Sequence, residues 1–158
     1  MATPINPLKD AGVPQHILSL LDRLHAASIR FITPPREHFI ALDQDKCHFV
    51  YQLASAINAK NIVKAGTSFG VITIYLGLAV SANVEASETL KEHVPPVDML
   101  LLDIWAPMTL PALKALQPHL RYGAVVIVDN TISSAGHYED LLEYLQQENS
   151  GFTNLTNP

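Results

Sequence analysis

The sequence predicts an α/β fold built on a parallel β-sheet, and three observations support this prediction. First, the short β-branched run at 61–65 is followed by a glycine turn at 66–70 and then by a long apolar segment. Second, the run at 97–103 is apolar apart from its aspartates, which is typical of a strand covered on both faces, and the run at 123–129 is a further strong strand signal. Third, amphipathic patterns separate these runs, which indicates helical crossovers between parallel strands.

The turn that follows the first strand reads Gly66-Thr67-Ser68-Phe69-Gly70. Gly66 allows a sharp turn and a close approach of the backbone to a ligand. Thr67 or Ser68 is placed to cap the next helix, whose first N–H groups lack partners within the helix. The spacing Gly-x-x-x-Gly is not the full dinucleotide-binding fingerprint, so a ligand-binding loop and a merely tight connection both remain open.

Length and composition exclude several classes of protein. A chain of 158 residues with 48% hydrophobic residues is expected to form one domain with a core. The net charge of -5 and the absence of a Lys/Arg cluster argue against a nucleic-acid partner. No apolar run is long enough to span a membrane, and the first residues do not resemble a secretory signal. Cys47 is the single cysteine, so we expect no internal disulfide and a reducing, cytoplasmic location.

The order of the patterns divides this one domain, 1–158, into N-terminal helices at 1–60 and an α/β core at 61–158. Asp43 is a plausible N-cap, and just after it we expect Cys47 to pack in the interior and His48 to lie on the surface. The ranges expected to be helical are 14–30, 43–59, 69–82, 107–120 and 135–147, with a short helix around 87–93 and a last strand at 152–155.

Polar residues follow the ends of the three predicted strands. The first strand ends at the glycine turn, the second at Asp103, and the third at Asp129-Asn130. In an open α/β sheet ligands bind just outside the carboxyl ends of the strands, so we expect these side chains to converge. Two carboxylates and an amide carbonyl suit Mg²⁺ or Ca²⁺ rather than zinc. The alternative is structural, because Asp often caps a helix and Asp-Asn often forms a turn.

Two further residues near this edge have both a functional and a structural interpretation. His137 could act as an acid or base, although a surface histidine at a helix start is the more common case. Trp105 could form the wall of a substrate pocket or pack beneath its own loop.

Several motifs together resemble the class I S-adenosylmethionine-dependent O-methyltransferases, in particular the catechol O-methyltransferase-like group and its fungal members of secondary metabolism. The resemblance extends from about Leu18 to Leu155. The segments that carry it are Asp45-Lys-Cys47, Phe49-Val-Tyr-Gln-Leu53, Asn61 to Leu76, Val97-Asp-Met-Leu-Leu-Leu-Asp-Ile-Trp105, Gly123-Ala-Val-Val-Ile-Val-Asp-Asn130 and Tyr138-Glu-Asp-Leu-Leu142.

This resemblance implies a Rossmann-like methyltransferase fold and a set of site residues. In the family the glycine loop holds the methionine part of S-adenosylmethionine, and a divalent metal binds the substrate hydroxyl and stabilises its oxyanion. The implied metal ligands and catalytic residues are Asp103, Asp129 and Asn130, with Mg²⁺ as the expected ion. The implied cofactor-binding residues are Gly66, Thr67, Ser68, Phe69, Gly70 and Asp103.

The chain departs from the family pattern at four places. Lys64 stands where the family usually has an acid, and Ala106 stands where catechol-type members have a lysine base. A strand–helix–strand section of on the order of 40 residues, longer than the ~30 of one βαβ unit, is expected to be missing after the first helix. The chain also stops at Asn157-Pro158, before the family's closing hairpin. We therefore expect an incomplete fold that lacks the second and third strands of the family and its closing hairpin. The chain is then either a natural degenerate member of the family or an incorrectly spliced or shortened gene product.

The function expected from the resemblance is O-methylation of a small hydroxylated natural product. The lost section would supply the carboxylate for the ribose and the slot for the adenine, so we expect weak binding of the donor. The alternatives are a non-catalytic protein that pairs with a full-length homologue and a repurposed fold that catalyses a step without methyl transfer. Exposed apolar edges would favour association, so a homodimer is also expected.

Overall fold

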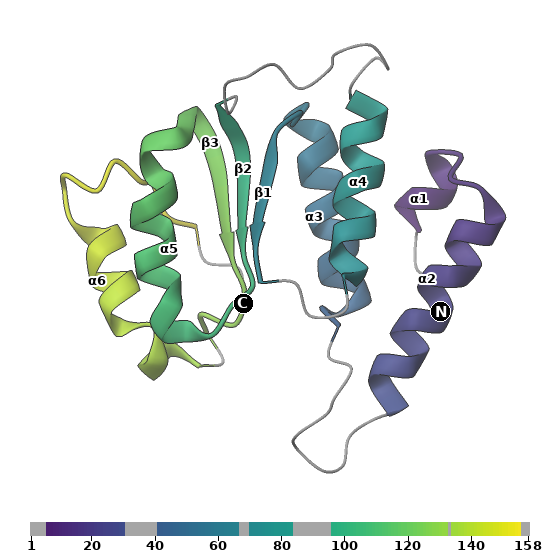
Figure 1. The fold of residues 1–158 in the computed structure, drawn as a ribbon, viewed down its shortest axis with the longest axis horizontal. Coiled ribbons are helices and arrows are strands. Elements are labelled where there is room, and N and C mark those ends of the chain that lie inside the picture. The colour runs from purple at the N-terminus through teal and green to yellow at the C-terminus, as the bar shows by residue number, and fades with distance from the viewer. Residues whose placement is uncertain (1–5, 31–40, 67–69, 84–95, 133, 156–158) are drawn as a thin grey trace. The chain divides into compact units, whose positions relative to one another are not determined.

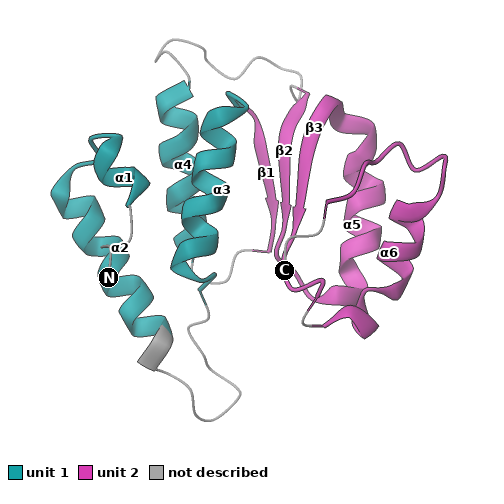
Figure 2. Ribbon diagram, turned by 180° about the vertical axis from the view of Figure 1, so that it is seen from behind, with its two compact units in different colours: residues 1–60, 67–92 teal, residues 61–66, 93–158 magenta. Residues whose placement is uncertain are grey.

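A computed structural model describes residues 6–30, 41–66, 70–83, 96–132 and 134–155. The chain divides into two compact units, shown in different colours in Figure 2. The first unit comprises residues 1–60 and 67–92, and the second comprises residues 61–66 and 93–158. The helix after the glycine turn therefore belongs with the N-terminal helices, whereas the strand before the turn belongs with the rest of the sheet.

The first unit is helical in its described part. Its elements are α1 (Pro7–Asp10), α2 (Gln15–Arg30), α3 (Gln44–Ala56) and α4 (Val71–Asn83). The predicted helices at 14–30, 43–59 and 69–82 are confirmed, and their ends differ from the prediction by at most three residues. Asp43 does occupy the N-cap position of α3, but its side chain makes no capping hydrogen bond. None of the described helices combines the length and apolarity needed to cross a bilayer.

Helices α3 and α4 pack side by side in this unit (Figures 1 and 2). Tyr75 on α4 is fully buried, and so are Cys47 and Ala54 on α3. Asn83, the last residue of α4, donates from Nδ2 to the carbonyl oxygens of Ala54 at 3.3 Å and Ala59 at 2.9 Å. This amide therefore bonds to carbonyl groups in the last turn of α3 and just beyond its end, and links the end of α4 to them.

A polar cluster lies inside the helical unit around the hydroxyl of Tyr75. His25 Nε2 on α2 is 3.1 Å from the Tyr75 hydroxyl, and the ring centroid of His48 is 5.8 Å from that of Tyr75. The expectation that Cys47 packs in the interior is confirmed. The expectation of a surface position for His48 is wrong, because its Nε2 atom is buried. His48 is half-buried because its ring contacts Tyr75 on α4, a contact between distant segments that the sequence pattern did not reveal.

We predict that acidification destabilises this helical unit. Burial lowers the pKa of His25 from 6.5, assisted by the neighbouring charge of His48, and burial likewise lowers the pKa of His48. In the unfolded chain both imidazoles gain a proton near pH 6.5, whereas in the folded chain they resist protonation to a lower pH. Since the unfolded state then binds more protons, stability is complete above pH 6.5 and falls as the pH drops through the folded pKa values.

The measurement is urea unfolding monitored by circular dichroism between pH 7.5 and about pH 5, above the range in which carboxylates titrate. The matched control is His25→Gln, which keeps a polar group near Tyr75 but cannot gain a proton. We expect a smaller loss of stability on acidification in this variant than in the unmodified chain. Equal losses in both proteins would contradict the role given to His25.

The second unit contains a three-stranded parallel sheet in the order β1-β2-β3. The strands are β1 (Ile62–Ala65), β2 (Val97–Leu102) and β3 (Leu120–Val128). Every residue of the central strand β2 is buried, as its continuous apolar sequence predicts. β3 begins three residues earlier than expected because Leu120 already pairs with Val97, and the register then shifts before Val125 in a stretch that includes Gly123, with φ +74°.

Two helices of this unit, α5 (Thr109–Leu116) and α6 (Glu139–Gln146), lie on the same side of the sheet in Figure 2. A core between them and the sheet contains Leu100 and Leu102 of β2 together with Leu113, Tyr138 and Leu141. The expected helix 107–120 is shorter in the structure, with 3₁₀ turns at Ala106–Met108 and Gln117–His119, both of which contain proline. The expected strand at 152–155 is wrong, because these residues form no ladder and are largely exposed.

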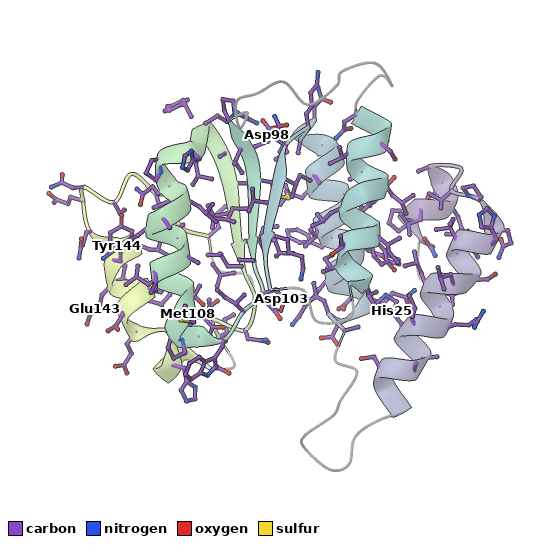
Figure 3. All side chains as sticks on the ribbon, in the orientation of Figure 1. His25, Asp98, Asp103, Met108, Glu143 and Tyr144 are labelled. Atoms are coloured by element: carbon purple, nitrogen blue, oxygen red, sulfur yellow. The ribbon has the colours of Figure 1, made fainter. Side chains whose placement is uncertain are left out.

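An ion pair holds the amino-terminal edge of the sheet together. Asp98 on β2 accepts a hydrogen bond from the backbone N–H of Asn61 at 2.8 Å and pairs with the guanidinium of Arg121 on β3. Figure 3 shows Asp98 at the end of the sheet opposite to Asp103. The charged residue within the apolar run of β2 therefore joins all three strands at the edge away from the predicted site.

Candidate functional site

The three strands end level with one another, which brings the predicted site residues onto one edge. Ala65 of β1 pairs with Leu102 of β2, and Leu102 pairs with Val128 of β3. The residues that directly follow this row are Gly66, Asp103 and Asp129. Because neighbouring strands lie about 5 Å apart, these three positions are adjacent at the carboxyl edge. The predicted convergence of Gly66, Asp103 and Asp129 is therefore present in the structure.

Gly66 is required at this edge by the close approach of two strand ends. Its φ of +92° lies in the region that side chains other than glycine rarely adopt. A Cβ atom at this position would overlap the backbone carbonyl oxygen of Asp103 and crowd the side chain of Ile104. The backbone N–H of Asp103 donates to the carbonyl oxygen of Ala65 at 2.9 Å, which fixes the two chains against each other. The first glycine of the turn thus has a structural role that is independent of any ligand.

Lys64 and Asp103 form an ion pair beneath this turn. The ammonium nitrogen of Lys64 lies 3.3 Å from Oδ2 of Asp103, and the same ammonium donates to the carbonyl oxygen of Gly66. The side chain of Lys64 is only 8% exposed, and that of Asp103 is 27% exposed. The pair is therefore largely shielded from solvent, so salt screens it less than a surface pair.

Asp129 and Asn130 lie beyond the end of β3, next to the Asp103 position. The amide Nδ2 of Asn130 donates to Oδ2 of Asp129 at 2.8 Å. Asn130 has φ +63°, a left-handed conformation that asparagine tolerates better than most residues, and its carbonyl oxygen accepts from Ser134 N–H at 3.1 Å. The pair therefore forms a polar turn, as its structural interpretation predicts, with the Asp129 carboxylate at the sheet edge.

The side chains at this edge are not arranged as a divalent metal site. A metal site requires carboxylates that are open to the ion, but Asp103 is engaged by the Lys64 ammonium. Asn130 turns the nitrogen of its amide, rather than its oxygen, toward Asp129. The role of Asp103, Asp129 and Asn130 as Mg²⁺ ligands stays a prediction, and Lys64 argues against it.

A pocket lies between the start of α5 and the start of α6 in the same unit, and Gly66, Asp103, Asp129 and Asn130 do not line it. It has a volume of about 390 Å³, within the range of small-molecule sites. Its lining includes Ala106, Leu110, Lys114, His137, Tyr138 and Asp140.

Tyr138 connects this pocket with the polar edge. Its side chain is 6% exposed, and burial raises its pKa, as do the negative charges of Asp129 and Asp103. The phenol therefore lines the pocket while its hydroxyl is within electrostatic range of both carboxylates. A ligand in the pocket would thus lie next to Tyr138, while Asp103 and Asp129 are not among the residues that line the pocket.

The remaining predicted residues are placed as follows. Thr67, Ser68 and Phe69 lie outside the described residues, as does the expected short helix at 87–93. Gly70 precedes α4 with φ +76°. His137 is exposed in a 3₁₀ turn, as its surface interpretation predicts. Trp105 is 75% exposed and does not pack beneath its loop, which leaves its role as a substrate wall as a prediction.

The ion pair between Lys64 and Asp103 could not be read from the sequence pattern alone. Lys64 was identified from the sequence as a departure from the family pattern but was given no partner. A signal for a counter-charge was present, because a lysine within a four-residue strand is almost never buried without one. The nearest acid in the register is Asp103, one position beyond the partner of Ala65.

Comparisons with known proteins support the fold but do not assign a family. No protein-family model matches this chain, and no curated protein matches it either. Among solved structures, the crystal structure of cofactor-bound Rv0187 from MTB is similar, with a TM-score of 0.61 and 19% sequence identity. The similarity covers 94% of this chain and 88% of that one. The chain therefore has a mixed α/β fold with a parallel sheet, a fold that it shares with a protein solved with its cofactor bound.

Proposed function

We propose that this chain is an S-adenosylmethionine-dependent O-methyltransferase that acts on a small hydroxylated natural product in secondary metabolism. The donor is proposed to bind at the turn after β1, and the acceptor in the pocket beside Tyr138. The observation that carries the proposal is the level row of Gly66, Asp103 and Asp129 at the carboxyl edge of a parallel sheet. Ligands of open α/β sheets bind at this edge, and a protein of the same fold was solved with a cofactor.

The proposed reaction transfers the methyl group from the sulfonium of the donor to the hydroxyl oxygen of the acceptor. The carbon–sulfur bond breaks as the carbon–oxygen bond forms, and the hydroxyl proton leaves to a base. Asp129 at the sheet edge and His137 in the pocket lining are the candidate proton acceptors. Alignment of the acceptor oxygen with the methyl group would supply much of the rate, because correct positioning can lower the activation free energy by on the order of 7–11 kcal/mol.

The affinity for the donor is proposed to be low. The resemblance places the ribose-binding carboxylate on a strand in a section that follows the first helix, and only residues 84–96 separate α4 from β2 in this chain. Loss of a charge-assisted contact costs about 1.5–3 kcal/mol, which is roughly one to two decades of affinity. We therefore expect slow turnover that requires a high donor concentration.

A second candidate is a repurposed or non-catalytic protein that pairs with a full-length homologue. The observation that favours it is the Lys64–Asp103 pair, because Asp103 is engaged internally rather than open to a ligand. An exposed Tyr122 on the outer strand β3 and the uncovered backbone of that edge would favour association with another chain.

The experiment that tests the proposal is incubation of the full chain with methyl-labelled donor and a panel of catechols and other phenols. We expect slow, time-dependent label transfer to at least one phenol, and a catechol-type methyltransferase serves as the positive control. Absence of transfer at millimolar donor would contradict the proposal. Transfer that occurs only after mixing with a homologous methyltransferase would favour the second candidate.

A further inference from the structure

At the carboxyl edge of the sheet, the positively charged ammonium of Lys64 lies next to Asp103, where a divalent ion would otherwise bind. We propose that the Lys64 ammonium acts as an internal counter-ion that replaces this divalent metal and makes the site independent of metal. The inference concerns ion binding alone, so it stands whether or not the chain transfers methyl groups.

The ammonium of Lys64 is held by two partners, a carboxylate and a backbone carbonyl. Lys64 Nζ lies 3.3 Å from the Asp103 carboxylate and donates to the Gly66 carbonyl oxygen, so two of its three N–H groups have defined directions. Its side chain is 8% exposed, so the ammonium is largely removed from solvent. A lysine in such surroundings is held by its partners and does not exchange freely with solvent.

The backbone of Gly66 also helps to hold the Lys64 ammonium next to Asp103. Gly66 adopts φ +92° and packs against the backbone of Asp103, with no room for a Cβ atom. In this arrangement the Gly66 carbonyl oxygen accepts from Lys64. The glycine conformation, the ammonium and the carboxylate therefore form one unit across β1 and β2.

Electrostatic repulsion from Lys64 would oppose the binding of a divalent cation at Asp103. A divalent cation that approached Oδ2 of Asp103 would come within a few ångströms of a buried positive charge. The repulsion between them is screened little, because water is largely excluded from the lysine. Binding would require displacement of the ammonium, which then loses both its partners. The ion pair and the metal are thus mutually exclusive at this carboxylate.

The proposal predicts that removal of the ammonium opens Asp103 to a metal. Lys64→Met keeps the length and much of the apolar volume of the side chain but removes its charge. The matched control is Lys9→Met in α1, an exposed lysine whose replacement changes the net charge equally. A third protein, the double variant Lys64→Met/Asp103→Asn, tests whether any new site uses Asp103.

The measurement is Mn²⁺ binding to the full chain, followed by the loss of the free-ion electron paramagnetic resonance signal, with thermal unfolding as a second readout. We expect at least tenfold tighter Mn²⁺ binding and a metal-dependent rise in Tm in Lys64→Met. We expect neither change in Lys9→Met, and loss of the gain in the double variant.

Two results would overturn the proposal. One is Mn²⁺ affinity in Lys64→Met that does not exceed that of Lys9→Met. The other is submillimolar binding by the unmodified chain that Asp103→Asn abolishes, because it would show that metal and ammonium share the site. The second result needs only the unmodified chain and Asp103→Asn, so the proposal can be overturned even if Lys64→Met does not fold.

Discussion

Gly66→Ala is expected to lower the free energy of unfolding by about 3 kcal/mol or more, a large part of the stability of an average domain. Two effects add. The φ of +92° strains any residue with a Cβ atom, and the new methyl group would overlap the Asp103 carbonyl oxygen. The backbone of β1 would have to shift away from β2, so that Gly66 would no longer lie level with Asp103 and Asp129 at the site. Urea unfolding monitored by circular dichroism measures the loss.

The matched control for this change is Gly123→Ala in β3. Gly123 also has a positive φ, +74°, but its Cβ atom would meet only Arg121 at an ordinary contact distance of 3.6 Å. This variant isolates the cost of conformation, which is about 1–2 kcal/mol. Equal losses in the two alanine variants would contradict the close approach between Gly66 and Asp103.

Asp103→Asn is expected to destabilise the protein by about 2 kcal/mol. The substitution keeps the size of the side chain but leaves the buried ammonium of Lys64 without its counter-charge. Removing one partner of a fully buried pair costs about 3–5 kcal/mol, and the lower value here reflects the 27% exposure of Asp103. Glu143→Gln on the exposed surface of α6 is the matched control for loss of one acid, with an expected change below about 0.5 kcal/mol.

A double-mutant cycle separates the ion pair from other effects of Asp103→Asn. Lys64→Met should restore part of the stability lost in Asp103→Asn, because no unpaired charge then remains at the sheet edge. Additive losses in the double variant would show that the two residues do not interact, and would contradict the ion pair seen in the structure.

The sheet and its site edge could be predicted from the sequence because the signals are local. Continuous apolar runs fix β2 and β3, and the glycine turn fixes the end of β1. Parallel pairing then places Gly66, Asp103 and Asp129 on one edge without further information. The helices of the first unit were also predictable, since their apolar stripes recur with the helical period.

The features that the sequence did not predict depend on contacts between distant segments. Lys64 was identified as a departure from the family pattern, but it forms an ion pair with Asp103 on the neighbouring strand end. His48 was expected on the surface, yet it faces Tyr75, 27 positions along the chain. The 152–155 run looked like a strand by composition, but no neighbouring strand pairs with it. In each case the outcome depends on a segment that is distant in the sequence, and a local sequence pattern carries no information about it.

Isothermal titration calorimetry of the full chain with S-adenosylmethionine is the most direct test of the claim that this sheet edge is a donor site. The account predicts saturable binding about one to two decades weaker than that of an intact O-methyltransferase measured in the same buffer. The product, S-adenosylhomocysteine, should compete for the same site. Absence of saturable heat with millimolar donor, from a chain shown to be folded by circular dichroism, would contradict the account.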